Sequence, residues 1–298
     1  MESRPLKNIS GWEPSRPFFS TQSQNHFYPN ATHILGFCFD GTTSFRPGAR
    51  FGPDSIRDAS FGIETYSPYL DGDIADLNIY DIGNIPIHPS NWLKMNTIFH
   101  QTTKDLNLIK NNIKLLTLGG EHSISYGPIR LYLDHYKDLL LVHLDAHADL
   151  RDGYLEEKYS HASIIRRVMD HLKSPAELLQ YGIRSGTKEE FIWMKENKTR
   201  MSSLEELIGK LEQVPSDRPI YLTLDLDYFD PSFFPGTGTP EPGGENFHSF
   251  IKLVKVLNQK NFVGADVVEL SPQLDSTLNS SVFASKVCRE LLLCLQKS

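Results

Sequence analysis

Acidic and histidine side chains follow the end of an apolar segment near the middle of the chain. Residues 139–144 are almost wholly apolar, and Asp145, His147 and Asp149 come directly after them at every second position. Alternate residues of an extended chain point to the same face. We therefore expect these three side chains to converge on one point, where two carboxylates and an imidazole could hold a metal ion.

Two further apolar segments end in the same way. The segment 221–224 runs into Asp225 and Asp227, which again share one face of an extended chain. The segment 113–118 runs into two glycines and a glutamate before His122, and the glycines suit a tight turn that presents His122 at the rim. Three such strand ends in one chain indicate a common site rather than unrelated caps and turns.

The charges of this candidate site favour two metal ions over one. Its carboxylates would repel one another and could not all remain ionised without cations. Two divalent ions balance the four carboxylates, whereas one ion would leave an excess of about two negative charges. Carboxylate and imidazole ligands without sulfur suit Mn(II) or a similar ion. The predicted metal ligands are His122, Asp145, His147, Asp149, Asp225 and Asp227.

Two other histidines lie close to these motifs in the sequence. His161 follows Ser160 at the start of a predicted helix, where a capping or surface role and a proton-transfer role both stay open. His143 lies within the segment 139–144, and we expect it to face the opposite side of the strand from Asp145. The remaining histidines lack a comparable context.

Apolar segments of strand length alternate with amphipathic segments of helix length along the chain. The predicted strands are residues 34–39, 79–82, 113–118, 139–144, 178–183, 221–226 and 263–270. The predicted helices are residues 92–112, 125–135, 162–171, 188–197, 203–212, 247–258 and 281–296. This alternation predicts an α/β fold in three layers, αβα, with a central, mostly parallel sheet and helices on both faces. Ligands bind at the carboxyl ends of the strands in such sheets, which is where the candidate metal ligands fall.

The composition is that of an ordinary globular protein and argues against several classes. The 298 residues carry 30 Lys and Arg against 37 Asp and Glu, and this net charge of −7 disfavours a nucleic-acid partner. No apolar stretch is long enough to span a membrane, and residues 1–20 lack the apolar core of a secretory signal. The three cysteines fit neither a disulfide framework nor a zinc motif, so we expect buried thiols in a reducing cytoplasm. We expect one domain, residues 1–298, with residues 1–30 as a loosely ordered lead-in.

Taken together, the motifs resemble those of the ureohydrolase family, which contains the arginases and agmatinases, and they are most similar to those of agmatinases. The resemblance covers the chain from about residue 30 onward. It rests on residues 44–53, 119–123, 145–149, 225–231 and 236–244, and residues 66–71 and 73–77 are also agmatinase-like. Two positions depart from the family pattern. Thr223 stands where a serine is usual, and Ala162-Ser163 replaces a Gly-Thr pair.

The resemblance implies an arginase-like or deacetylase-like fold and a pair of Mn(II) ions. One ion would bind His122, Asp145, Asp149 and Asp225, and the other would bind His147, Asp145, Asp225 and Asp227, so that Asp145 and Asp225 bridge. Glu241 would hydrogen-bond and orient a guanidinium group, His161 would transfer protons, and Asp230 would order its loop. Water held between the ions would lose a proton, and the hydroxide would attack the guanidinium carbon to release urea and an amine.

The resemblance also bears on the choice of guanidine through the loop 150–160. Arginases use Asn and Ser in this loop to recognise the α-carboxylate and α-amine of their substrate, whereas this loop has no Asn and only Ser160. The leading hypothesis is therefore agmatine, which would give putrescine and urea. The loop carries Asp152, Glu156 and Glu157, and we expect both glutamates to be solvated loop charges rather than substrate ligands.

Other interpretations stay open from the residues alone. A guanidinobutyrase or an arginase would keep the same metal site. A non-catalytic, metal-binding regulatory or scaffold protein would keep the fold but would be expected to lose metal ligands or His161. A single-zinc amidohydrolase of the deacetylase fold would bind only one ion. The complete ligand set argues against the last two. The resemblance also implies a homo-oligomer, a trimer or hexamer, that acts on a small cationic guanidine.

Overall fold

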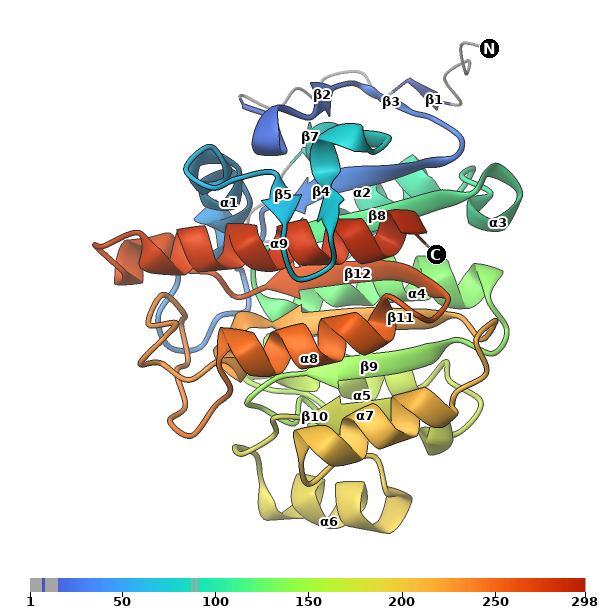
Figure 1. Ribbon diagram of the computed structural model, residues 1–298. Coiled ribbons are helices and arrows are strands. Elements are labelled where there is room, and N and C mark those ends of the chain that lie inside the picture. Colours follow the sequence, from blue (N-terminus) through green and yellow to red (C-terminus); the bar gives the residue numbers. More distant parts are fainter. Residues whose placement is uncertain (1–6, 9–15, 87, 89–90, 298) are drawn as a thin grey trace.

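A central sheet of eight strands crosses the protein, for which a computed structural model describes residues 7–8, 16–86, 88 and 91–297 (Figure 1). In spatial order the strands are β10 (Leu178–Tyr181), β9 (Leu140–Leu144), β11 (Ile220–Asp225), β12 (Phe262–Val268), β8 (Ile113–Gly119), β4 (Ala31–Phe37), β7 (Ile79–Asn84) and β2 (Gln22–Ser23). Every neighbouring pair is parallel. The predicted parallel sheet is therefore confirmed.

Helices cover both faces of this sheet and make the three-layer αβα arrangement that the sequence predicts. One face packs against α1 (Gly52–Ser60), α7 (Leu204–Gln213), α8 (Phe247–Leu257) and α9 (Asn279–Lys297). The other face packs against α2 (Trp92–Thr103), α4 (Tyr126–His135), α5 (Ile164–Met169) and α6 (Lys188–Asn197). Figure 1 shows α7, α8 and α9 in front of the sheet and α2, α4 and α5 behind it. The central strands are buried along their whole length, as expected for strands covered on both sides.

Side-chain caps explain where several of these helices begin. Asn91 accepts a hydrogen bond from the backbone N–H of Lys94 at the start of α2. Thr187 and Glu190 form a reciprocal capping box at α6. Such caps satisfy backbone N–H groups that have no partner within the helix. These polar side chains therefore fix where the two helices begin.

Two helical predictions differ from the structure. The predicted helix 92–112 is two helices, because α2 ends at Thr103 and Asn107 caps a separate short helix, α3 (Leu108–Asn111). Helix α1 is absent from the predictions, because its first turn lies in a Gly- and Pro-rich segment that resembles a loop. Pro53 is compatible with that first turn, where its missing N–H would have no intrahelical partner.

Parts of the described segment before β4 contribute to the core. Phe18 and Phe27 are fully buried, and β2 extends the sheet beside β7. The lead-in that we expect over residues 1–30 includes residues 1–6 and 9–15, which lie outside the described residues. The assignment of residues 1–298 to one domain stays a prediction.

The described residues also form short strands and 3-10 helices outside the main sheet and its covering helices. The remaining strands are β1 (Lys7–Asn8), β3 (His26–Phe27), β5 (Tyr66–Ser67) and β6 (Gly72–Asp73), which form two small antiparallel pairs. The 3-10 helices are η1 (Phe18–Ser20), η2 (Ala49–Phe51), η3 (Ile74–Asp76), η4 (His122–Ser125), η5 (His161–Ser163), η6 (Pro175–Glu177), η7 (Leu226–Tyr228) and η8 (Pro272–Leu274). Three of them, η4, η5 and η7, carry residues of the candidate site.

The thiols of Cys38, Cys288 and Cys294 are buried, as predicted. Among the described helices, none has the length and apolar character that a membrane crossing requires.

Candidate metal centre and active site

Four neighbouring strands bring the candidate site together at their carboxyl ends. Asp145 directly follows β9, and Asp225 is the last residue of β11. Glu269 directly follows β12, and His122 begins η4 shortly after β8. Because β9, β11, β12 and β8 are adjacent in the sheet, their ends form one continuous row. The sequence-predicted ligands therefore meet at the place expected for a parallel sheet.

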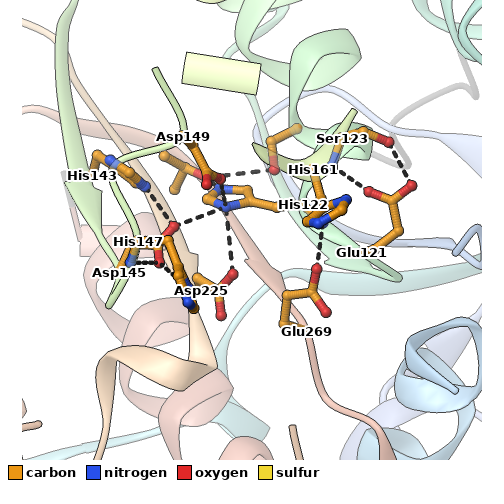
Figure 2. Close-up of polar contacts among 12 residues, drawn as sticks. Glu121, His122, Ser123, His143, Asp145, His147, Asp149, His161, Asp225 and Glu269 are labelled. Atoms are coloured by element: carbon orange, nitrogen blue, oxygen red, sulfur yellow. Dashed lines mark hydrogen bonds and ion pairs between the residues drawn. The ribbon is translucent and has the colours of Figure 1, made fainter. Parts of the chain in front are cut away.

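His122 lies at the centre of the first group of ligands (Figure 2). Its Nδ1 atom lies 3.0 Å from Asp145 Oδ2, 3.0 Å from Asp149 Oδ2 and 3.4 Å from Asp225 Oδ2. All four side chains are buried. Although three carboxylate oxygens surround it, Nδ1 has no hydrogen-bond partner of acceptable geometry among the described residues. A buried nitrogen that faces carboxylates in this way suits a shared metal ion better than a hydrogen bond.

His147 forms the second group with two of the predicted carboxylates. Its Nδ1 atom lies 2.9 Å from Asp227 Oδ2 and 3.5 Å from Asp145 Oδ1. Asp145 thus presents Oδ2 to the first group and Oδ1 to the second. Asp225 lies beside both groups, because its Oδ1 accepts a hydrogen bond of 2.9 Å from the backbone N–H of Asp227.

The orientation of His122 leaves its Nδ1 lone pair free for a cation. Its Nε2 atom lies 2.9 Å from the hydroxyl oxygen of Thr223. That hydroxyl donates to Asp266 Oδ1 at 2.7 Å, so it accepts from Nε2–H of His122. In the neutral imidazole that binds a metal, the proton then resides on Nε2 and Nδ1 carries the lone pair, which is the usual arrangement of a metal-binding histidine. Thr223, which departs from the family pattern, thus keeps the hydroxyl that this orientation needs.

Burial and mutual repulsion raise the pKa values of several carboxylates in the cluster. Burial, with a further contribution from Asp145, raises the pKa of Asp149 to about 7. Burial and the charges of Asp227 and Asp145 raise the pKa of Asp225 well above its ordinary value. Burial would also raise the pKa of Asp145, but hydrogen bonds with His122, His143 and His147 lower it well below its ordinary value. Two divalent cations would relieve this repulsion, and the donor set of carboxylates and imidazoles fits them.

The backbone at Asp149 has an unusual conformation. Its φ angle is +52°, in the left-handed region that residues other than glycine rarely adopt. This conformation turns the chain after the motif so that the Asp149 carboxylate points back at His122. Strain of this kind is typical of functional sites.

His143 belongs to the site, so the expectation that it faces away from Asp145 is wrong. The two residues are separated by two positions, and they share one face of the chain. His143 is completely buried, and its Nε2 atom lies 2.8 Å from Asp145 Oδ2. Burial lowers the pKa of His143, although its hydrogen bond with Asp145 opposes this effect.

A cavity of about 200 Å³ opens above the ligands and could admit a small substrate. It is lined by Ser44, His122, His147, Ala148, Asp149, Arg151, Tyr154, His161, Ala162, Ser185, Gly186, Glu190, Asp225, Thr239 and Glu269. At least one ligand of each group, including both histidines, thus lines the cavity, together with His161 and two glutamates. The guanidinium of Arg151 lies 4.8 Å from the centre of the Tyr154 ring.

His161 lies on the cavity wall, where it could exchange protons with a substrate. Its Nε2 atom lies 3.1 Å from Ser44 Oγ, and Nδ1 lies 3.4 Å from Thr42 Oγ1. Burial lowers the pKa of His161 to about 4, so the imidazole is neutral at pH 7. Ser160 and Ser163 form a capping box around it, so the Ala162-Ser163 departure keeps the local helix start intact.

Glu241 lies near the second group but is less enclosed than the other predicted residues. Its Oε1 atom lies 3.9 Å from His147 Nε2, and its side chain is 38% exposed. It is not among the residues that line the cavity in the described chain. Its backbone carbonyl accepts two hydrogen bonds from Arg184, which fix the loop. The guanidinium-orienting role of Glu241 stays a prediction.

Glu269 is, like Glu190, an acidic residue of the cavity that the sequence predictions miss. Its Oε1 accepts a hydrogen bond of 3.0 Å from the backbone N–H of His122. Burial, together with the charge of Glu121, raises the pKa of Glu269 well above its ordinary value. The predicted strand 263–270 includes this residue, whereas β12 ends at Val268 and Glu269 turns out of the strand with a φ of +68°. The signal that could have found it is a glutamate near the end of an apolar strand.

The remaining sequence-predicted residues are placed as follows. Asp230 accepts hydrogen bonds from the backbone N–H groups of Gly243 and Gly244, which confirms that it orders the loop. Glu156 and Glu157 are exposed, as expected for solvated charges. Asp152 pairs with Arg167 at 2.6 Å.

Known proteins are similar to this chain in sequence and in fold. The model of the arginase family matches residues 30–294. The chain is 40% identical over 264 residues to an agmatinase of Bacillus subtilis strain 168, which covers 87% of this chain and 90% of that protein. It is 33% identical over 274 residues to a guanidinobutyrase of Pseudomonas aeruginosa, which covers 88% of this chain and 85% of that protein. The solved structure of proclavaminate amidino hydrolase from Streptomyces clavuligerus has a TM-score of 0.85 and 28% identity, covering 95% of this chain and 97% of that one. By sequence and by fold, this chain belongs to the arginase family.

Proposed function

We propose that the protein is an agmatinase, which hydrolyses agmatine to putrescine and urea with two Mn(II) ions. One observation carries this proposal. Two histidine Nδ1 atoms, each beside buried carboxylates, share Asp145 at the base of a cavity of about 200 Å³. The 40% identity to an agmatinase over most of the chain supports agmatine as the substrate.

The two groups of ligands suggest how the ions would be held. The first ion would bind His122, Asp145, Asp149 and Asp225, and the second would bind His147, Asp145, Asp225 and Asp227. Asp145 and Asp225 would be shared. Asp145 presents one oxygen to each histidine, and Asp225 places Oδ2 beside His122 while its Oδ1 accepts the backbone N–H of Asp227. Mn(II) is the ion that we propose, because the set contains carboxylates and imidazoles but no sulfur.

A pair of divalent ions at this position supplies a strong nucleophile from water at neutral pH. The chain's own residues must then orient the guanidinium, whose carbon is a poor electrophile because its charge is shared by three nitrogens. Glu269 is enclosed in the cavity, and we propose that its carboxylate accepts hydrogen bonds from the guanidinium. Glu241, at the more open side, would provide a second carboxylate for the same group. Two carboxylates on different sides would hold the planar guanidinium in one orientation.

His161 would manage the protons of the reaction. The leaving amine must gain a proton before the C–N bond can break, and the attacking water must lose one. A neutral imidazole can accept and then deliver a proton, and the lowered pKa of His161 keeps it neutral at pH 7. Its Nε2 contacts the exposed Ser44 hydroxyl, which offers a route for protons to solvent.

One observation favours a second candidate substrate, 4-guanidinobutyrate. Arg151 lines the cavity, and among the described residues no carboxylate forms an ion pair with it. A cation in the cavity wall would attract the carboxylate of guanidinobutyrate and repel the ammonium group of agmatine. The guanidinobutyrase relative makes this alternative concrete.

The experiment that tests the proposal is a urea-release assay with agmatine, arginine and 4-guanidinobutyrate. Metal-stripped protein is compared with protein reloaded with Mn(II), Zn(II) or Mg(II). We expect the highest kcat/KM with agmatine and Mn(II). A clear preference for arginine or guanidinobutyrate would reject agmatinase, and turnover with about one zinc per chain would reject the two-ion site.

Two further properties are proposals that follow from the family resemblance. We propose a homo-oligomer, a trimer or a hexamer, which light scattering after size-exclusion chromatography would measure. A cytoplasmic location is consistent with the three buried free thiols.

A further inference from the structure

His143 takes part in a chain of buried polar groups that the proposed mechanism does not use. It lies in β9 directly opposite Gln180 of the neighbouring strand β10. Gln180 in turn contacts Thr199, and all three side chains are completely buried. Polar groups in the middle of a sheet cost free energy unless they are hydrogen-bonded, so their direction of bonding can be worked out.

A backbone carbonyl fixes the direction of this chain. The carbonyl oxygen of Ala148 can only accept, and it lies 3.2 Å from the side-chain nitrogen of Gln180. The same nitrogen donates to Nδ1 of His143 at 3.1 Å, while the amide oxygen accepts from the Thr199 hydroxyl at 2.9 Å. Nδ1 of His143 is therefore an acceptor, and the ring proton resides on Nε2.

The fixed proton of His143 restrains one oxygen of Asp145. Nε2–H donates to Asp145 Oδ2 at 2.8 Å, and this is the oxygen that faces His122. The other oxygen, Oδ1, accepts the backbone N–H of His147 at 2.5 Å and faces the His147 ring. Both oxygens of the shared carboxylate are thus held, each beside a different group of ligands.

We propose that His143, Gln180 and Thr199 are positioning residues that fix the rotation of the Asp145 carboxylate, so that each of its oxygens faces one of the two ions. Both ring nitrogens of His143 already have partners, so it does not act as a ligand itself. Packing alone does not require a histidine at this position, because the neighbouring residues of β9, Val142 and Leu144, are apolar and equally buried. Groups that orient metal ligands typically change metal affinity or activity by about 10- to 100-fold.

Four variants test this proposal. His143→Leu removes both hydrogen bonds, and His143→Gln restores a donor of similar length. Thr199→Val removes the hydroxyl that holds the Gln180 amide in one orientation. His33→Leu is the matched control, because His33 is also completely buried in the sheet and accepts one hydrogen bond, from the N–H of Tyr28, far along the sheet from the site.

The primary measurement is calorimetric titration of each metal-stripped variant with Mn(II), with thermal unfolding of the same samples to verify folding. The second measurement is kcat and KM with the preferred guanidine, and only this kinetic arm rests on the proposed function. We expect His143→Leu to bind Mn(II) about 10- to 100-fold more weakly and to lose kcat by a similar factor, with KM changed less than about threefold. His143→Gln should recover much of this loss, Thr199→Val should show a smaller loss, and His33→Leu should lose thermal stability but not Mn(II) affinity.

Two outcomes would overturn the proposal. One is a folded His143→Leu protein that binds Mn(II) as tightly as the parent. The other is an equal loss of Mn(II) affinity in His33→Leu, which would mark the effect as a general weakening of the sheet. If the parent protein releases urea from none of the guanidines, the proposed function fails, and the Mn(II) titration still decides the role of His143.

Discussion

Glu269→Gln should lower activity and raise stability at the same time. Glu269 is 6% exposed, and among the described residues its one hydrogen-bond donor is the backbone N–H of His122. In the proposed complex its carboxylate makes charge-assisted hydrogen bonds with the guanidinium, which are worth about 1.5–3 kcal/mol. Loss of this interaction corresponds to a kcat/KM about 10- to 100-fold lower. The amide keeps the size of the side chain, so the change is one of charge.

The same substitution relieves an electrostatic cost in the folded protein. Burial and the charge of Glu121 raise the pKa of Glu269, so the folded protein disfavours the ionised form. A raised carboxyl pKa means that the contribution to stability is fully present below the ordinary pKa, about 4.3, and is lost as the pH rises toward the folded value. At pH 7.5 we expect the metal-free Glu269→Gln variant to be more stable than the metal-free parent by about 1–3 kcal/mol. For a chain of this size this is a rise in Tm of about 2–4 °C for each kcal/mol.

The assay pairs steady-state kinetics of the Mn(II)-loaded enzyme with calorimetric unfolding in the presence of a chelator. Glu190→Gln is the matched control, because Glu190 lines the same cavity but already accepts backbone N–H groups of Leu150 and Thr187 at 2.8 and 2.7 Å. The same change there removes good hydrogen bonds and should lower Tm. A Glu269→Gln enzyme with kcat/KM within about twofold of the parent, or with a lower metal-free Tm at pH 7.5, would refute the reasoning.

Four other substitutions, and one control, address the remaining roles. Asp227→Ala and His147→Ala should each leave about one Mn(II) per chain after dialysis, measured by atomic absorption, because only the second group is damaged; two bound ions with full turnover would contradict the ligand assignment. His161→Ala should lower kcat by about 100-fold or more with both ions retained, and loss of the ions would show a structural role instead. Because burial lowers the pKa of His161 to about 4, its contribution to stability is present above about 6.5 and is lost as the pH falls toward 4; unfolding free energies of His161→Ala should vary less over this range than those of the parent. Arg151→Gln should raise kcat/KM for agmatine relative to 4-guanidinobutyrate by about tenfold, whereas Arg166→Gln, which removes an exposed pair with Asp170, should not; equal ratios in both variants would exclude Arg151 from substrate selection.

The sequence predicts the site well where local spacing alone determines which side chains meet. Asp145, His147 and Asp149 follow one strand at alternate positions, and the structure brings all three to the cluster. The same alternation places His143 on their side of the strand, where the structure has it beside Asp145. The parallel sheet and its helical layers also follow from the alternation of apolar and amphipathic segments.

The sequence does not predict features that depend on the order of strands in space. β12 is the last strand in the chain, yet it lies between β11 and β8, and this position alone carries Glu269 into the row of ligands. Nothing near Glu269 in the sequence repeats the alternating acidic pattern. The chain from His143 through Gln180 to Thr199 likewise depends on the pairing of β9 with β10 and on a loop contact. Such contacts between distant segments require the tertiary structure.

The net charge of −7 has a different meaning once the site is considered. Four of the 37 acidic residues, Asp145, Asp149, Asp225 and Asp227, lie in the buried cluster. If they bind two divalent ions, the net charge of the loaded protein is about −3. Most of the excess negative charge then lies in the metal site, and little is left on the surface to attract a cationic substrate. The acidic groups of the loop 150–160 do not provide such a field either. Asp152 is paired with Arg167, and Glu156 and Glu157 are exposed to solvent. On the proposed function, selection among guanidines must therefore depend on the cavity itself. There Glu269 would bind the guanidinium that all candidates share, and Arg151 is a lining cation that would distinguish their other ends.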